Sequence, residues 1–504
     1  MKTQALNAVF RSIDQNGQGT VSPGDILGCL SGAGIGPDDG RLAALHKRLN
    51  DIGELPIDRK AFAGLVESSG SLVARAVRGE LIIPDFDRFS ATLRGIADAA
   101  YAESGGQVAT YIPQLARASA DSFAVAVSTI DGQQLALGDA NTGFTLQSSC
   151  KPVLYAAALE EHGVDKVHNH VGREPSGLSF NELSLNKQGL PHNPMINAGA
   201  IMTSSLIRRD LSTADRLDYL MNLVSALSGQ GAPRFNTAVW HSERETADRN
   251  FALAHHMRER GAFPPGIEIG PTLDYYFSAC SIEVTARDMA GIGATLANGG
   301  ICPTTGQRVF SEDTVKNTLS MMFSCGMYDY SGEFAFSVGI PAKSAVSGVV
   351  LAIVPNVLSV AIWSPRLDAC GNSVRGVAFL KKLVERFCFH NYDSLVDSSK
   401  EDPRCVRSAT QTDLTYRAIY AASVGDVSEL KRLLARGHDL NTADYDGRTP
   451  LHLASAEGHV DTVQYLLRQG ACAEAKDRWS FTPPDDAKRH RQARVVALFE
   501  KRAA

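Results

Sequence analysis

Two long apolar runs in the middle of the chain predict β-hairpins. The run Val346–Trp363 is long enough to suggest a membrane span, but a Pro-Asn pair divides it into VVLAIV and VLSVAIW, both rich in β-branched residues. Residues 123–139, FAVAVSTIDGQQLALGD, place an Asp-Gly pair between two strand-like runs, which is the strongest short-range hairpin signal. We therefore expect paired strands and no membrane span.

Helical patterns surround these strands. Residues 1–80 form short amphipathic stretches joined by Gly-rich turns, a long helix-rich stretch separates the two hairpins, and an amphipathic pattern over Val374–Phe389 follows the second hairpin. A strand pair, a large helical insertion and further strands of the same sheet make an α+β arrangement.

A repeat of 33 residues follows the polar segment 397–412. Gly425 and Gly458 occupy equivalent positions in it, as do Gly437 and Gly470, and residues 449–454 read TPLHLA, the ankyrin signature. We expect two full units and a fragment. So short an array must cap against something, such as another subunit, and its repeats are expected to dock protein partners.

A chain of 504 residues is too long for one hydrophobic core, so the fold class is multidomain. We expect four segments: an α EF-hand-like domain over 1–84, an α+β domain over 85–396, a linker over 397–412 and α ankyrin repeats over 413–504.

The segment Asp14–Asp25 has the layout of an EF-hand calcium loop. Its positions 1, 3 and 5 carry side-chain oxygens and position 6 is glycine, but position 5 is the neutral Gln18 and position 12 is Asp25 in place of a bidentate glutamate. The partner segment near 50–58 has no ligand pattern. We expect a packing domain that does not bind calcium.

Charge and cysteine content narrow the partners and the compartment. The formal charge is −5 and no long basic run occurs, which argues against nucleic acid as a partner. The nine cysteines are scattered and lack CxxC pairs, as expected of free thiols in a reducing compartment and not of disulfides or a zinc site. The N-terminus resembles neither a secretory signal nor a transit peptide, so we expect a cytoplasmic protein. A mitochondrial matrix address is the alternative if the chain is a processed form.

The candidate chemistry centres on Ser148 and Lys151. Their i, i+3 spacing puts both on one face of a helix, and Pro152 is tolerated only if that helix begins near Ser148. There the backbone N–H groups can stabilise an oxyanion, and a desolvated lysine can act as base. The motif alone equally describes a capping serine and a solvated lysine. Its position between a hairpin and an apolar helix favours catalysis, as does Lys343-Ser344 before the late hairpin, in the order used by β-lactamase-type hydrolases.

Other segments carry more amides, carboxylates and phenols than scaffolding needs. They are PHNPMINAGA at 191–200, SERE and DRN within 242–250, Tyr275-Tyr276, and GMYDYSG around Tyr328. Each is compatible with a structural role when taken singly. Together they supply groups for an α-ammonium, an α-carboxylate and a reacting amide. The expected activity is hydrolysis of the side-chain amide of a small amino acid, with glutamine as the first candidate.

Ten motifs spread over nearly all of residues 85–395 resemble those of the serine-dependent glutaminase family. They are YIPQLA, LQSSCKP, VGREPSGLSFN, PHNPMINAGA, SERE with DRNFA, SIEVT, TLANGG, SCGMYDYSGEFAF and VPNV. The order of EF-hand-like domain, catalytic domain and ankyrin repeats is similar to that of animal kidney-type and liver-type glutaminases. The resemblance implies a β-lactamase-like fold, hydrolysis of L-glutamine to L-glutamate and ammonia through an acyl-enzyme, and no metal or organic cofactor.

The resemblance also implies roles for individual residues. Ser148 matches the nucleophile and Lys151 the base, and the backbone N–H groups of Ser148 and Val346 would form the oxyanion hole. Tyr276 or Tyr328 would protonate the leaving ammonia. The positions that match substrate-contacting residues are Tyr111, Gln147, Ser148, Asn197, Glu243, Asn250, Tyr276, Tyr328 and Val346.

Two departures from the family pattern stand out. Family members commonly read SCVK where this chain has SSCK, and the i, i+3 spacing to the lysine selects Ser148 over Ser149. In the loop 179–186, Ser184 replaces a phenylalanine of the kidney-type pattern. That loop lies at the tetramer interface in the family, so we expect a homotetramer, with a filament as a higher assembly, but altered activation by phosphate.

Two other interpretations remain open at this stage. A different Ser-x-x-Lys acyl hydrolase, such as a β-lactamase or an esterase, has no need for the set Asn197, Glu243 and Asn250. A non-catalytic scaffold has no need for an intact Ser148 and Lys151. Glutamine hydrolysis is therefore the favoured function.

Overall fold

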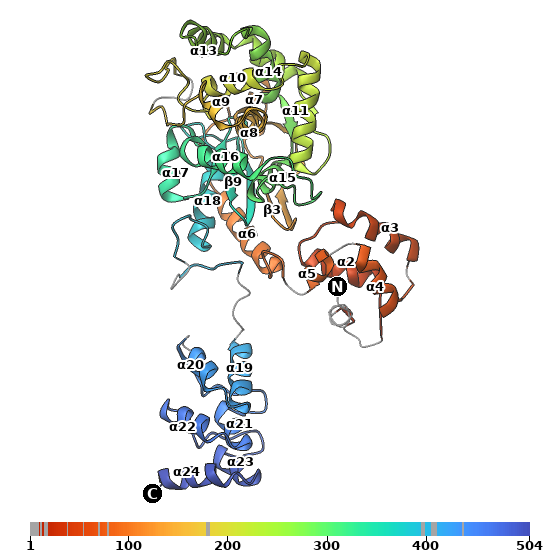
Figure 1. Cartoon of the computed structure of the whole chain (residues 1–504), viewed down its shortest axis with the longest axis vertical. Helices are drawn as coiled ribbons and strands as arrows, with labels where there is room; N and C mark the ends of the chain where they lie inside the picture. Colours follow the sequence, from red (N-terminus) through yellow and green to blue (C-terminus); the bar gives the residue numbers. More distant parts are fainter. Residues whose placement is uncertain are drawn as a thin grey trace. The chain divides into compact units, whose positions relative to one another are not determined.

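The computed structural model describes residues 10, 13–14, 19–37, 39–53, 55–68, 71–77, 80–177, 182–394, 399–404, 411–435 and 438–503. The chain divides into two compact units, Met1–Arg404 and Cys405–Ala504 (Figure 1). This division falls inside the segment expected as a linker. The boundary expected at residues 84 and 85 lies within the first unit and stays a prediction.

The first unit is built on a five-stranded antiparallel sheet in the order β4-β3-β10-β9-β8. Its strands are β3 (Ala124–Thr129), β4 (Gln134–Gly138), β8 (Ala342–Ser344), β9 (Val349–Val354) and β10 (Leu358–Trp363). A small sheet has the order β5-β7-β6, with β5 (Phe144–Thr145), β6 (Arg234–Phe235) and β7 (Ile282–Val284).

Helices cover both faces of the large sheet. Alternate residues of β3 belong to different cores: Val125 packs with α6 (Phe86–Tyr101) and α18 (Val374–Arg386), whereas Ala126 packs with α15 (Ala286–Ala297) and the helices beyond it (Figure 1). Because both faces are buried, the strands read as continuous apolar runs in the sequence.

The remaining helices of this part form the layer that carries the polar segments. They are α7 (Pro113–Ala116), η2 (Gln147–Cys150), α8 (Lys151–His162), α9 (Val164–His168), α10 (Asn197–Leu206), α11 (Thr213–Ser228), α12 (Thr237–Glu245), α13 (Asp248–Glu259), α14 (Ile269–Cys280), α16 (Glu312–Cys325), η3 (Tyr328–Tyr330) and α17 (Ser331–Ser337).

Both expected hairpins are confirmed, with left-handed backbone at their turns, where Gly132 has φ +82° and Asn356 has φ 62°. The expected helix Val374–Phe389 was too long, because α18 ends at Arg386. Phe387 is extended, and its ring packs 5.1 Å from that of Phe89 on α6. Aromatic packing against a neighbouring helix therefore replaces the last helical turn.

The N-terminal part is helical, as expected. It comprises β1 (Thr20–Val21), α2 (Pro23–Gly32), η1 (Gly40–Leu42), α3 (Ala43–Ile52), β2 (Ile57–Asp58), α4 (Arg59–Ser68) and α5 (Ser71–Val77). The carboxylate of Asp25 accepts hydrogen bonds from the backbone N–H and the hydroxyl of Ser22, so it caps α2. Positions 3 and 5 of the candidate calcium loop lie outside the described residues.

The turn of the first hairpin joins this N-terminal part to the sheet. Asp131 pairs with Arg75 at 2.8 Å, and its carbonyl accepts a hydrogen bond from Arg41. Buried Gln133 donates to the carbonyls of Ala33 and Ile83. The Asp131-Gly132 turn therefore closes the hairpin and also contacts the N-terminal helical part.

The described residues of the second unit form three helix pairs where we expected two full units and a fragment. They are α19 (Gln411–Ser423) with α20 (Val427–Ala435), α21 (Pro450–Glu457) with α22 (Val460–Arg468), and α23 (Pro483–Arg489) with α24 (Ala493–Ala503). The expected fragment is a full pair because Thr482 and Pro483 repeat the helix start made by Thr449 and Pro450. The ankyrin architecture itself is confirmed.

None of the described helices is long and apolar enough to cross a membrane. All eight cysteines within the described ranges are free thiols, and no group of metal-ligating side chains occurs among those residues.

Candidate active site

Ser148 lies in the short 3-10 helix η2, which leads directly into α8 at Lys151. Pro152 falls in the first turn of α8, so the helix begins where the sequence required it. Gln147, just before the serine, has φ 48°, a conformation that is costly for a residue with a side chain. The chain accepts strain at the position that sets the direction of Ser148.

The lysine side chain joins Ser148 to Asn197. Lys151 Nζ lies 2.8 Å from Ser148 Oγ and 2.7 Å from Asn197 Oδ1. Lys151 is fully buried, and burial lowers its pKa to about 8. A substantial share of the lysine is therefore neutral near physiological pH, as a general base requires.

The neighbouring serine has a different environment. Ser149 Oγ donates to the carbonyl of Leu146 at 2.6 Å and is buried. This contact closes the turn before α8. Ser149 is held as a structural residue, whereas the Ser148 hydroxyl contacts the lysine.

A second cluster surrounds the Glu243 carboxylate on α12. The hydroxyl of Tyr111 lies 2.6 Å from Glu243 Oε1 and 3.0 Å from Gln147 Oε1. Burial raises the pKa of Glu243, while hydrogen bonds from Tyr111 and Gln147 and the charge of Lys151 act in the opposite direction. A buried carboxylate held this way is suited to an ammonium group.

Two amides and a phenol extend the lysine network. Asn197, at the start of α10, donates through Nδ2 to Asn250 Oδ1 on α13 at 3.2 Å. The Tyr276 hydroxyl on α14 lies 3.4 Å from Asn197 Oδ1. Burial raises the pKa of Tyr276 well above its ordinary value, with the nearby thiols of Cys280 and Cys150 adding to the effect, so the phenol stays protonated.

Tyr328 approaches the same serine from another segment. Burial raises its pKa, and hydrogen bonds with the Ser148 side chain and the Val346 backbone act against that rise. Its backbone has φ 53°, and Gly326 packs so close to β8 that a Cβ there would lie 1.8 Å from the Ala342 carbonyl oxygen. The tight packing on β8 fixes the phenol beside Ser148.

Val346 follows β8 and packs against Ile112, Leu115 and Val239. It therefore lies between the segment of Tyr111 and helix α12, which carries Glu243. The structure thus brings all nine predicted substrate-contacting residues, and the predicted base Lys151, into one connected region. The interface loop is only partly described, and the role expected for Ser184 stays a prediction.

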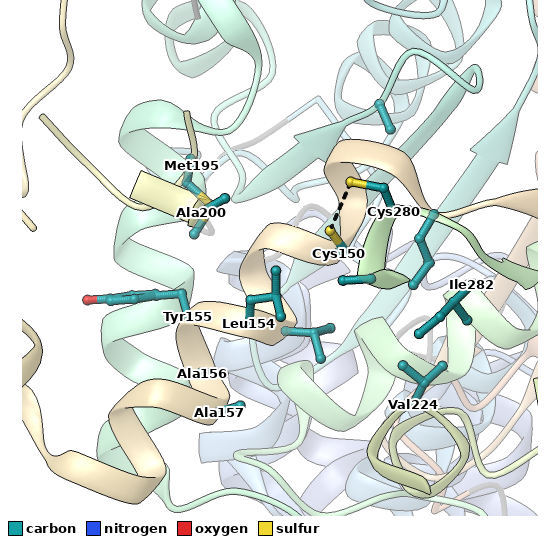
Figure 2. Packing of buried hydrophobic residues seen from close by; sticks show 14 of the residues in the cluster. Cys150, Leu154, Tyr155, Ala156, Ala157, Met195, Ala200, Val224, Cys280 and Ile282 are labelled. Atoms are coloured by element: carbon teal, nitrogen blue, oxygen red, sulfur yellow. Dashed lines mark hydrogen bonds between the residues drawn. The ribbon is translucent and has the colours of Figure 1, made fainter. Parts of the chain in front are cut away.

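Two further groups belong to this region but were not among the predicted site residues. Lys343 is fully buried, donates to the carbonyls of Gly326 and Ser344, and has its Nζ 4.5 Å from the centre of the Tyr328 ring. Its place in the Lys-Ser motif before the late hairpin was a usable signal. Cys150 and Cys280 face each other with their sulfurs 4.0 Å apart (Figure 2), and nothing in the sequence pattern pairs them.

The arrangement has the parts of an acyl-transfer site: a serine hydroxyl on a buried lysine of lowered pKa, phenols that stay protonated, and a separate buried carboxylate. These parts come from segments between Tyr111 and Val346.

Comparison with known proteins agrees with this chemistry. A family model described as glutaminase matches residues 106–392, more than half of the chain. The chain belongs to the glutaminase family. This glutaminase also matches an EF-hand model at residues 5–84 and an ankyrin-repeat model at residues 418–467.

Two relatives match most of the chain. The rat glutaminase liver isoform, mitochondrial, is 45% identical over 88% of this chain and 74% of that protein. Putative glutaminase 3 of Caenorhabditis elegans is 43% identical over 93% of this chain and 82% of that protein. The chain is accordingly an enzyme that hydrolyses glutamine.

Two solved structures match about three-fifths of the chain. The native form of Mglu is 40% identical, with a TM-score of 0.58 over 61% of this chain and 74% of that one. A structure described as probable glutaminase ybaS is 36% identical, with a TM-score of 0.56 over 60% of this chain and 98% of that one.

Proposed function

We propose that this glutaminase converts L-glutamine to L-glutamate and ammonia through an acyl-enzyme on Ser148, with Lys151 as the base. The observation that carries the proposal is the 2.8 Å contact between Lys151 Nζ and Ser148 Oγ at a lysine whose pKa is lowered to about 8. Burial favours the neutral amine of the lysine. The short distance to Ser148 Oγ then allows this amine to accept the proton of the serine hydroxyl.

The proton steps follow from these contacts. Neutral Lys151 takes the proton of Ser148 as Oγ attacks the side-chain carbonyl carbon of glutamine. The backbone N–H groups of Ser148 and Val346 stabilise the oxyanion. The C–N bond then breaks, and a phenol, Tyr328 or Tyr276, gives its proton to the leaving ammonia and regains one from Lys151. Water cleaves the acyl-enzyme and releases glutamate.

The remaining residues hold the amino-acid end of the substrate. Glu243, supported by Tyr111 and Gln147, binds the α-ammonium group, and the amides of Asn197 and Asn250 orient the α-carboxylate. This division of roles explains why one carboxylate is buried with two hydrogen-bonding neighbours.

Acid quenching during turnover tests the acyl-enzyme directly. Mass spectrometry of the peptide that contains Ser148 should show a glutamyl adduct in the native chain and in Ser149→Ala, and none in Ser148→Ala. An adduct on Ser149, or glutamine turnover by Ser148→Ala, would contradict the mechanism.

For the rest of the molecule we propose a homotetramer that needs no metal or organic cofactor and does not bind calcium, with an activation by phosphate that is altered by Ser184 in the interface loop. We further propose a cytoplasmic address, with the mitochondrial matrix as the alternative. The scattered free thiols support a reducing compartment, and the engagement of Asp25 with Ser22 in the helix cap supports the absence of calcium binding. Glutamine hydrolysis measured with and without phosphate tests activation. The mass of the assembly, measured for the native chain and for a chain lacking residues 413–504, tests the oligomeric state. A native monomer of full activity would contradict the tetramer.

A further inference from the structure

An open groove of about 850 Å³ lies between α22 and α24 of the ankyrin unit. The first helices of the three pairs, α19, α21 and α23, pack extensively on one another, whereas α22 and α24 make fewer contacts. The second helices of the last two pairs therefore leave a channel on their side of the stack.

The residues lining the groove follow helical periodicity on both walls. The lining residues on α24 share one face of the helix because they are three or four positions apart. They are Arg494, Leu498, Lys501 and Arg502. Leu467 and Arg468 belong to the facing wall on α22. Two parallel helical stripes with an apolar floor make a shape into which a third helix fits.

The charge of this groove is of one sign. Four exposed cations border it, Arg468, Arg494, Lys501 and Arg502, and no acidic residue is among the described residues that line it. Arg502 also reaches across to the Leu467 carbonyl at 3.3 Å, which ties α24 to the end of α22. The cations therefore form a rim around an apolar floor.

We propose that this groove binds an acidic amphipathic helix of a partner protein, with apolar side chains on the floor and carboxylates against the four cations. Helices with one apolar face bind grooves in this way through residues spaced three and four apart. Complementary charge adds specificity and speeds encounter. The acidic residues of the partner must flank its apolar face, because the cations lie along the rim.

The apolar floor favours a helix over other anionic partners. Nucleic acid presents phosphates that are met by polar and cationic side chains, and an apolar channel adds little to that binding. A membrane surface is flat and cannot enter a channel between two helices. A second copy of this chain is another candidate occupant of the groove, and measuring the oligomer size distinguishes it from a partner protein.

The test uses the full chain and a fluorescent synthetic helix with leucines at i, i+3, i+4 and i+7 flanked by glutamates. We expect the glutamate peptide to bind with an affinity that weakens at least tenfold from low to high salt. The same peptide with lysines in place of the glutamates should not bind. Binding should weaken at least tenfold in the double variant R494E/K501E, and also in A497W, which fills the groove without changing its charge.

A matched double variant, K476E/K488E, changes the charge of the ankyrin unit equally at exposed positions outside the groove lining and should bind like the native chain. Glutamine hydrolysis should be unchanged in all three variants, which shows that the catalytic unit is intact. Equal binding of the lysine peptide, equal loss in K476E/K488E, or absence of binding would overturn the proposal. So would tighter binding of DNA or phosphatidylserine vesicles, or a change of oligomer size in R494E/K501E.

Discussion

The active site and the ankyrin groove use charged side chains in opposite ways. In the active site Lys151 and Glu243 are buried, and hydrogen-bonding neighbours contact both. In the groove Arg494 and Lys501 remain exposed to solvent. Burial lowers the pKa of Lys151 to about 8 and so favours its neutral form, which can take a proton. Burial raises the pKa of Glu243, but the hydrogen bonds from Tyr111 and Gln147 oppose that rise and favour the carboxylate.

The difference shows how location decides what a charge can do. A desolvated charge with fixed neighbours costs folding free energy but acts strongly on a reacting atom, because little solvent screens it. An exposed charge costs little and acts weakly, so several must combine to attract a partner. Substitutions should therefore affect catalysis in one region and binding or local stability in the other.

The largest effect is expected for the serine pair. Ser148→Ala should lower kcat by about 10⁴-fold or more, since it removes the proposed nucleophile. Ser149→Ala should keep kcat within about threefold, because that hydroxyl only closes a turn on Leu146. Steady-state ammonia release measures both. Equal losses would mean that the two serines are not distinguished by their environments.

Next comes the buried carboxylate. Glu243→Gln should lower kcat/KM by about 10²–10³-fold, since an ammonium group would lose its buried partner. Glu245→Gln on the same helix is the control, because Glu245 is exposed and should change kcat/KM by less than about twofold. If both variants matched the native chain, Glu243 would not bind the substrate.

The lowered pKa of Lys151 predicts how the rate of acylation depends on pH. A pKa of about 8 means that the neutral base grows from a minor to the major form as pH rises from 7 to 9. The rate of acylation should therefore rise about tenfold over that interval and then level off. Single-turnover measurements across this range check the sign. A rate that falls with increasing pH would exclude Lys151 as the base.

The smallest effect concerns the ankyrin unit. Gly458→Ala should destabilise it by about 1–2 kcal/mol, because this residue has φ +80° and a Cβ would lie 2.3 Å from the Gln492 side chain. Gly470→Ala is the matched control: φ is +88° but nothing lies within 4 Å of the added Cβ, so its effect should be smaller. Thermal unfolding measures both, with glutamine hydrolysis unchanged. A fall in activity with either variant would show that the two units are coupled.

Local patterns predicted most of the architecture. The hairpin turns, the helix start at Lys151 and the ankyrin helices depend on interactions between residues close in sequence, such as the Thr449 capping contacts. Two local predictions were wrong, the end of the helix at Phe389 and the partial third repeat. In the first, Phe387 packs on a helix almost 300 positions earlier in the chain, which no local pattern records. In the second, the Thr482-Pro483 helix start was already present in the sequence and marks a full pair.

The sequence by itself determined both hairpins, the helix start at Lys151, the ankyrin repeats, the spacing of Ser148 and Lys151, and the set of residues that resembles a glutaminase. Only the tertiary structure decided that Lys151 reaches Asn197, that Tyr111 supports Glu243, and that Lys343 lies against the Tyr328 ring. The physical reason is that a pKa and a hydrogen bond depend on burial and on distances of a few ångströms between segments. Those distances are set by how helices pack on the sheet and not by the neighbours of a residue along the chain.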